Sequence, residues 1–161
     1  MVLAGLMALL LGQGGPRQPT CPAVEFQWAH VGSSWDNSNH WTGGTSGEFP
    51  GSSLKNGDAN IGNPVGATFW PQMQANRCIC NLDMTASSQL DLNAKTLTVT
   101  GTATFDSTNR TNEPIKFTNT AGTAAYLNAS SIVINGGSLG TRLEFGGSQI
   151  TVQSGSYGSC P

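Results

Sequence analysis

Short segments in which apolar and polar side chains alternate recur at a nearly constant spacing through the second half of the chain. The clearest lies at residues 96–100, where Leu97 and Val99 alternate with threonines, a pattern typical of a strand with one buried face. Similar apolar-x-apolar triplets begin at Cys80, Leu97, Ile115, Ile132 and Ile150, a repeat of about 17–18 residues. A second, less even series lies between them and begins at Leu90, Ala103, Ala125 and Leu143.

This repeat predicts a parallel β-helix, because each coil of a β-solenoid needs two or three strands and their corners before it stacks on the next coil. We expect two short strands per repeat and about five coils, which together occupy residues 78–161. The alternative is a β-sandwich or jelly roll, since these folds also place strands at intervals of roughly 8–12 residues. An all-β class agrees with a composition rich in Gly, Ser, Thr and Asn and only 10% charged.

Length and charge limit the possible partners. A chain of 161 residues is long enough for one domain with its own core. The formal net charge is −2 and the few Lys and Arg residues are not clustered, so the basic surface that nucleic-acid-binding proteins need is absent. The same distribution gives no electrostatic attachment to anionic membranes.

Residues 1–15 form an apolar segment, which we call the arm. Its large apolar residues are Val2, Leu3, Leu6, Met7, Leu9, Leu10 and Leu11, a run shorter than the roughly 20 residues of a membrane span. One interpretation is a secretory signal cleaved near Gly12–Gly15, although the usual positive start is missing. The other is a retained arm, which a neighbouring subunit must cover because no side of it is polar. Residues 16–23 contain three prolines and predict an extended connector.

The four cysteines favour disulfides. They are Cys21, Cys78, Cys80 and Cys160, an even number, as in disulfide-bonded secreted proteins. A structural zinc site is the alternative, but a Cys-x-Cys spacing lacks the usual two intervening residues. In a strand the Cα atoms of Cys78 and Cys80 lie about 7 Å apart, so each pairs more easily with a distant partner, for which Cys21 and Cys160 are the candidates.

Residues 24–77 differ from the repeats because tryptophans are crowded among glycines, asparagines and serines. The segment contains Trp35-Asp36-Asn37-Ser38-Asn39-His40-Trp41-Thr42-Gly43-Gly44, then Pro50-Gly51 and Gly57-Asp58-Ala59-Asn60-Ile61. It resembles the segment that leads into the coils of secreted and cell-surface bacterial right-handed β-helix proteins of the autotransporter-passenger type. There a W-x5-W-x-G-G stretch, a Pro-Gly and a Gly-Asp precede threonine-rich coils. The resemblance implies a β-helix in an extracellular protein and carries no catalytic residues with it.

Two interpretations remain open for Trp28, Trp35 and Trp41. They can cap the first coil, because the end of a stack exposes apolar side chains that large aromatic residues cover with few residues. Alternatively, exposed rings form a platform on which sugars stack. Two sequons, at Asn109 and Asn128, are candidate glycosylation sites.

No catalytic, cofactor-binding or calcium-loop motif is present in the sequence, and we expect neither catalysis, a cofactor nor a metal site. A glycan-active enzyme would need two carboxyls at a defined separation, for which Asp91 and Asp106 are the nearest candidates. His40 beside Asp36 is a weaker catalytic candidate, as a general base and the acid that orients it. We therefore expect an extracellular structural protein whose partners are copies of itself, assembled into a surface fibre through the arm. A carbohydrate-binding module, with a glycan as partner, and a glycan-active enzyme are the alternatives.

Overall fold

The structure is a computed structural model that describes residues 24–52, 57–62, 68–108, 113–136, 142–147, 149–157 and 160. The arm and the connector lie outside the described residues, as do Cys21 and Asn109.

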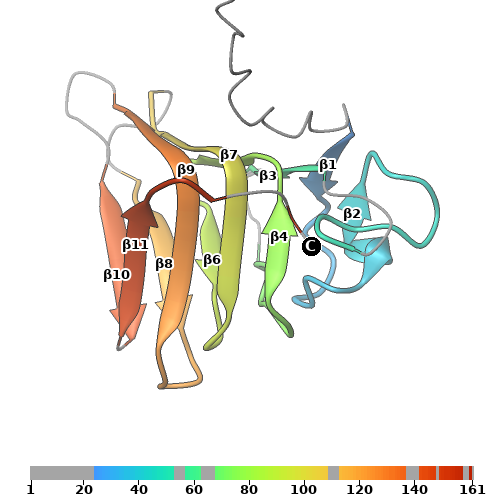
Figure 1. Cartoon of the computed structure of the whole chain (residues 1–161). Helices are drawn as coiled ribbons and strands as arrows, with labels where there is room; N and C mark the ends of the chain where they lie inside the picture. The colour runs from blue at the N-terminus through green and yellow to red at the C-terminus, as the bar shows by residue number, and fades with distance from the viewer. Residues whose placement is uncertain are drawn as a thin grey trace, which may run out of the picture.

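The described chain is all-β and forms a β-solenoid, as predicted from the sequence, but with about three turns in place of the expected five (Figure 1). Neighbouring strands run parallel throughout the stack, except that β2 pairs antiparallel with β1. A short 3-10 turn, η1 (Ser38–His40), precedes β2. The strands are β1 (Glu25–Trp28), β2 (Trp41–Thr42), β3 (Asp58–Ile61), β4 (Arg77–Ile79), β5 (Leu82–Thr85), β6 (Gln89–Asp91), β7 (Thr96–Asp106), β8 (Ile115–Asn119), β9 (Ala125–Asn135), β10 (Leu143–Gly147) and β11 (Ile150–Ser154).

Each coil has three faces, and the register of the strands defines them. The first face consists of β4, residues 96–99 of β7, residues 125–129 of β9 and β11. The second consists of β3, β5, residues 102–106 of β7 and residues 131–135 of β9, with β1 and β2 beyond β3. The third consists of β6, β8 and β10. The tryptophan-rich segment therefore joins the same sheet as the coils, through β1 and β3.

The coils are longer than the sequence repeat predicts. Leu97, Leu127 and Val152 are stacked in register on the first face, so one coil runs from position 97 to 127 and the next from 127 to 152. The expected coil, with two strands and the length of one sequence repeat, is wrong. Triplets beginning at Leu97, Ile115, Ile132 and Ile150 lie on the first, third, second and first faces, so each step of the repeat spans two of the three strands in a coil.

Columns of apolar residues fill the solenoid. On the first face Leu97 and Leu127 are fully buried, and on the second Leu82 and Ala103 are fully buried and in register. On the third face Leu90 lies in register with Phe117, which packs edge-on against Phe105 of the second face with ring centres 5.4 Å apart. Alternation along each strand therefore places one apolar set in a common core, as the sequence predicts.

Aromatic residues close the N-terminal end of the stack, which we call the capped end. Trp28, Trp35 and Trp41 are 2%, 0% and 6% exposed, and both Trp28 and Trp35 pack edge-on against Trp41. The indole N–H groups of Trp35 and Trp41 donate to the backbone oxygens of Pro50 (2.9 Å) and Trp35 (2.8 Å). These buried indole groups thus have partners, as a stable aromatic cap requires.

An ion pair attaches this cap to the first coil. The Arg77 guanidinium donates Nε–H and Nη2–H to the two Asp36 carboxylate oxygens at 2.9 and 2.5 Å. Both side chains are about four-fifths covered, and the guanidinium also lies over the Phe49 ring, 5.0 Å from its centre. This bidentate geometry fixes the orientation of the loop before η1 relative to β4.

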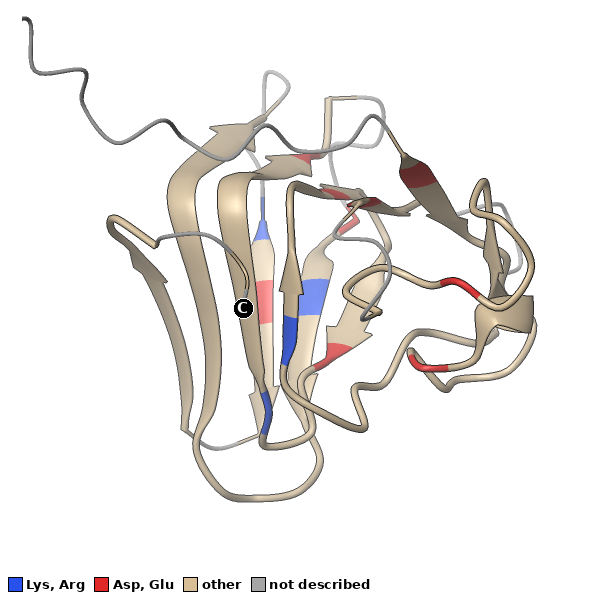
Figure 2. Cartoon of the chain, turned by 45° about the vertical axis from the view of Figure 1, so that its right-hand side comes forward, with Lys and Arg blue, Asp and Glu red and all other residues tan. Residues whose placement is uncertain are grey.

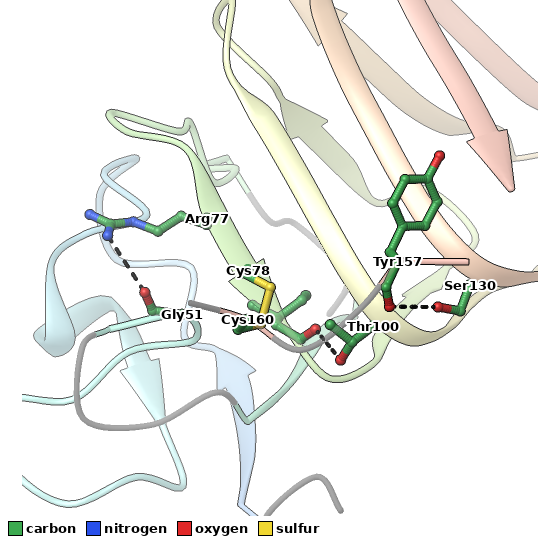
Figure 3. The surroundings of a disulfide bond; sticks show 8 residues. Gly51, Arg77, Cys78, Thr100, Ser130, Tyr157 and Cys160 are labelled. Carbon is green, nitrogen blue, oxygen red and sulfur yellow. Dashed lines mark hydrogen bonds between the residues drawn. A yellow bond between two sulfur atoms is a disulfide. The ribbon is translucent and has the colours of Figure 1, made fainter. Parts of the chain in front are cut away.

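The C-terminal segment crosses the stack from its last coil to its first. After β11 the Gly155 N–H donates to Ala129 O (3.0 Å) and the Ser130 hydroxyl donates to Tyr157 O (3.5 Å). The segment ends in a disulfide between Cys160 and Cys78 of β4, with Cα atoms 5.5 Å apart (Figure 3). We call residues 155–157 together with Cys160 the strap, because its disulfide joins it to Cys78, 82 residues earlier in the sequence.

Candidate functional site

Among the described residues, no further coil covers the apolar core at the C-terminal end of the stack. The inward-facing residues of the last coil lie in register with fully buried residues of the coil below: Ile134 with Phe105, Phe145 with Phe117 and Val152 with Leu127, for example. No described strand stacks beyond them, and Ile134 is 54% and Phe145 49% exposed. We call this surface the open end; its inward-facing residues are Ile132, Ile134, Leu143, Phe145, Ile150 and Val152.

Ile134 departs from the sequence-based expectation. The apolar alternation of residues 132–134 predicts a core position at which a charge would unfold the domain, but more than half of this side chain is exposed. Alternation identifies the side of the strand that faces the core, and it contains no information on whether another coil follows. The expectation for Ile134 is therefore wrong.

The open end also carries strand edges that no described strand covers. Residues 131–135 of β9, together with β10 and β11, pair with a neighbour on one side only in the part of the chain that the structure describes. The sequences of β9 and β11 contain no charged residue, and both strands are uncoloured in the charge map at the end of the stack away from the cap (Figure 2). Charges and prolines are common protections of an exposed edge. Their absence from these two strands leaves the edge able to accept another strand.

Two hollows that share Gln89 lie along the third face, and together we call them the groove. One is lined by Phe69, Trp70, Gln72, Gln89 and Asp91, among others. The other, about 460 Å³, is lined by Gln89, Lys116, Thr118, Glu144 and Phe145, and so reaches the open end. Phe69 is 50% exposed. Amides, carboxylates and an exposed aromatic ring are groups that hydrogen-bond and stack on sugars.

The three tryptophans that the sequence offered as a sugar platform do not lie on the surface. Trp28, Trp35 and Trp41 are buried in the cap, so none of them offers an open ring face to a pyranose. This burial favours the capping interpretation. Asn128 lies in β9 on the first face between Thr98 and Gln153, whose side-chain amide donates to Asn128 Oδ1 at 3.0 Å.

The candidate carboxylates are not brought together. Asp91 lies on the third face and Asp106 at the end of β7 on the second face. The alternation in its strand predicts a solvated position for Asp91, but the residue is 6% exposed and accepts hydrogen bonds from Gln72 and Thr120 at 2.9 and 2.7 Å. Each carboxylate therefore stabilises its own corner, and the pair lacks the shared cleft that a glycosidase needs.

His40 and Asp36 do not form a base and its orienting acid. The Nδ1 atom of His40 lies 2.9 Å from Ser34 O and its Nε2 atom 3.2 Å from Asn37 Nδ2. Both Asp36 oxygens are occupied by Arg77. The histidine therefore stabilises the turn that contains η1.

Two other acids have shifted pKa values. Burial raises the pKa of Asp83, and the nearby carboxylates of Asp58 and Glu25 raise it further, while a hydrogen bond from Thr104 opposes the shift. Hydrogen bonds from the hydroxyl and the N–H of Thr108 lower the pKa of Asp106. Both pKa shifts arise from the packing of a strand or a corner, since neither acid lines a pocket that the structure describes.

Among the described residues, no group of three or more His, Cys, Asp or Glu side chains is placed to hold a metal ion. The same part of the chain contains no helix long and apolar enough to cross a membrane. Cys78 and Cys160 form the disulfide described above, Cys80 is also disulfide-bonded, and none of the described cysteines is free.

Comparisons with protein-family models, with curated proteins and with solved structures found no match to this chain.

The open end is a functional candidate that the alternation pattern did not reveal. A signal for it exists in the sequence: all four tryptophans occur between residues 28 and 70, and no second aromatic cluster accompanies the last predicted strands. A stack that carries an aromatic cap at its beginning and none beside its last coil predicts one open end.

Proposed function

We propose that the protein is an extracellular structural subunit that assembles head to tail into a fibre through its open end. The observation that carries the proposal is the combination of exposed apolar side chains, Ile134 and Phe145 above all, with the uncharged edges of β9 and β11 at the same end of the stack. An apolar surface of this kind is normally covered in a soluble protein.

The asymmetry of the two ends supports a linear assembly. One end is closed by the tryptophan cap and the other is open, so a contact between the open end of one subunit and the region near the cap of the next joins two different surfaces. Contacts between two different surfaces propagate as open filaments unless the rotation between subunits closes a ring.

An extracellular location is supported by the disulfides, which persist in oxidising compartments. The resemblance of residues 35–61 to the leading segment of secreted bacterial β-helix proteins points the same way. The low content of charged residues, 10%, and the net charge of −2 agree with a surface protein that does not bind nucleic acid.

Two matched substitutions test the proposal by sedimentation velocity and negative-stain microscopy. Ile134→Asp is expected to weaken self-association at least about tenfold, because an unpaired carboxylate in an apolar contact costs more than roughly 1.4 kcal/mol. Tyr126→Asp places the same charge on a 39% exposed side chain on the outer side of the first face, where β9 is paired on both sides, and is expected to leave assembly intact. Equal melting temperatures would show that both variants fold, and a wild-type protein that stays monomeric at high concentration would contradict the proposal.

Carbohydrate binding by the groove on the third face is the second candidate function. The observation that favours it is the half-exposed Phe69 beside Gln72 and Gln89. A glycan array tests it: binding that is lost in Phe69→Ser and kept in Ile134→Asp would assign a glycan to this groove.

A further inference from the structure

We propose that residues 2–11 of one subunit cover the open end of the next subunit, so that the arm is the occupant of the assembly contact. This inference rests on the self-assembly proposed above and identifies the partner surface.

The open end offers an apolar inner surface to a strand that covers it. In residues 131–135 of β9, Ile132 and Ile134 face the core, and Ile134 is 54% exposed. On the outer side Val133, 37% exposed, lies between Ser131 and Asn135. A strand that pairs with this edge therefore contacts apolar side chains on its inner side and one apolar side chain on its outer side.

The arm has the required composition. Residues 2–11 contain no charged residue and no residue with a polar side chain, and the first charge in the chain is Arg17. Whether extended or helical, such a segment has no polar side to turn to water, and it gains by covering apolar surface. Edge pairing with an inserted strand also satisfies backbone hydrogen-bonding groups of both partners.

The capped end of a neighbour is a poor substitute for the arm. Its tryptophans are already buried against one another, and of its large apolar side chains in the described residues only Val31 and Phe69 are more than one-third exposed. Direct stacking of one folded subunit on another would therefore cover little apolar surface on the donor side.

The position and length of the arm permit this contact. The described chain starts next to β1, at the end of the stack opposite β10 and β11 (Figure 1). Residues 1–23, which precede it, span up to about 75 Å when extended, whereas the strands from β1 to β11 occupy about 24 Å along the stack. In a head-to-tail arrangement the arm needs only to cross the contact, while reaching its own open end requires the chain to run back along the whole stack.

Photo-cross-linking with isotope labels tests the inference. A benzophenone amino acid replaces Ile134 in light-isotope subunits, which assemble with heavy-isotope wild-type subunits before irradiation and tryptic digestion. We expect cross-links from position 134 to the heavy peptide 1–17, which ends at Arg17. The same probe in place of Val31, at the capped end, is expected to give no cross-link to that heavy peptide.

Deletion of residues 1–15 completes the test. We expect the deleted chain to sediment as a single subunit with the circular dichroism spectrum of a folded β protein. If it still forms fibres while Ile134→Asp does not, the open end is the contact but the arm is not its occupant, and the inference is overturned while the proposed function stands. Cross-links confined to one subunit, or a native chain whose intact mass shows that it begins after residues 12–15, would also overturn the inference. If wild-type protein fails to assemble at all, the proposed function falls with it.

Discussion

At the scale of single residues, a polar column stabilises the corner between the first and second faces. Asn81 Nδ2 donates to Asp58 Oδ1 at 2.9 Å, and the Thr102 N–H donates to Asn81 Oδ1 at 2.8 Å. The Gly101 N–H donates to Cys80 O at 2.8 Å. Three consecutive coils are thus linked by side-chain amide and carboxylate groups at a position where the strand ladder is interrupted.

Gly101→Ala is expected to lower the free energy of unfolding by about 1–3 kcal/mol. A Cβ atom at this position would lie 2.3 Å from Asn81 Oδ1 and 2.9 Å from Cys80 O, so the corner must open. Gly62→Ala is the matched control, because the nearest atoms to its Cβ lie 3.9 Å away. Urea denaturation measures both, and equal stability of the two variants would show that the corner is not closely packed.

The shifted pKa of Asp83 predicts a pH-dependent effect. Because burial raises its pKa in the folded state, ionised Asp83 destabilises the fold above that pKa, and the cost disappears as pH falls towards the ordinary value of 3.8. Asp83→Asn is expected to stabilise the protein at pH 7 and to have less effect at pH 4.

The shifted pKa of Asp106 predicts the opposite effect on stability. Hydrogen bonds from Thr108 lower its pKa, so its stabilising contribution is present above 3.8 and is lost as pH falls through the lowered value. Asp106→Asn should therefore destabilise the protein at pH 7. Thermal melts of both variants at the two pH values check these signs, and shifts of the same direction would contradict them.

At the scale of elements, the strap holds the last coil against the first. Its disulfide closes a loop between residues 82 positions apart, which restricts the unfolded chain. Replacing both Cys78 and Cys160 by serine is expected to lower the free energy of unfolding by about 2–5 kcal/mol. Hydrogen exchange should also become faster in β11, since β9 is its strand partner among the described residues. Unchanged hydrogen exchange in β11 would show that the disulfide stabilises the protein only by restricting the unfolded chain.

The elements themselves were largely predictable, but their arrangement in coils was not. Triplets such as those at Leu97, Ile115 and Ile132 mark strands correctly, because alternation reports one buried side. They cannot report how many strands make one coil. The chain bends within β7 and β9, at residues 100–101 and 130, without the Gly-Asn or Asp-Gly pairs that usually indicate a turn, so a three-strand coil had no distinct sequence signal.

The candidate site was predictable only in part. Burial of Trp28, Trp35 and Trp41 agrees with the expected cap, since a glycine- and serine-rich segment with few aliphatic residues has little else with which to close the stack. Alternation alone does not predict the open end, because Ile134 and Phe145 carry the same pattern as Phe105 and Phe117, which are buried. Their exposure depends on the number of coils, which is a property of the whole molecule.

At the scale of the whole molecule, the two ends differ in apolar exposure. The capped end carries the Arg77–Asp36 ion pair and covered aromatic rings, whereas β9 and β11 at the open end carry no charge (Figure 2). In a stack each coil is stabilised mainly by its neighbours, so the last coil has less support than the others. Covering the open end would therefore stabilise the subunit as well as join it to another.

This asymmetry predicts how assembly responds to solution conditions. Apolar contacts weaken on cooling and strengthen with excluded salts such as sulfate, while ion pairs between exposed groups weaken at high ionic strength. We expect fibre mass, measured by light scattering, to be nearly unchanged between about 0.05 and 0.5 M sodium chloride, to rise in sodium sulfate and to fall when the sample is cooled from about 25 °C to about 5 °C.

The charged residues of the last coil supply the control. Glu144 lies next to Phe145 in β10 but faces outward, where its carboxylate pairs with Arg142 at 2.5 Å and Lys116 at 3.4 Å. Glu144→Gln removes these pairs without changing the inward surface, so it should leave assembly unaffected, whereas Phe145→Ser should weaken it. Fibres that dissolve in sodium chloride, or that are lost in Glu144→Gln and kept in Phe145→Ser, would assign the contact to the charged outer side of β10 in place of the open end.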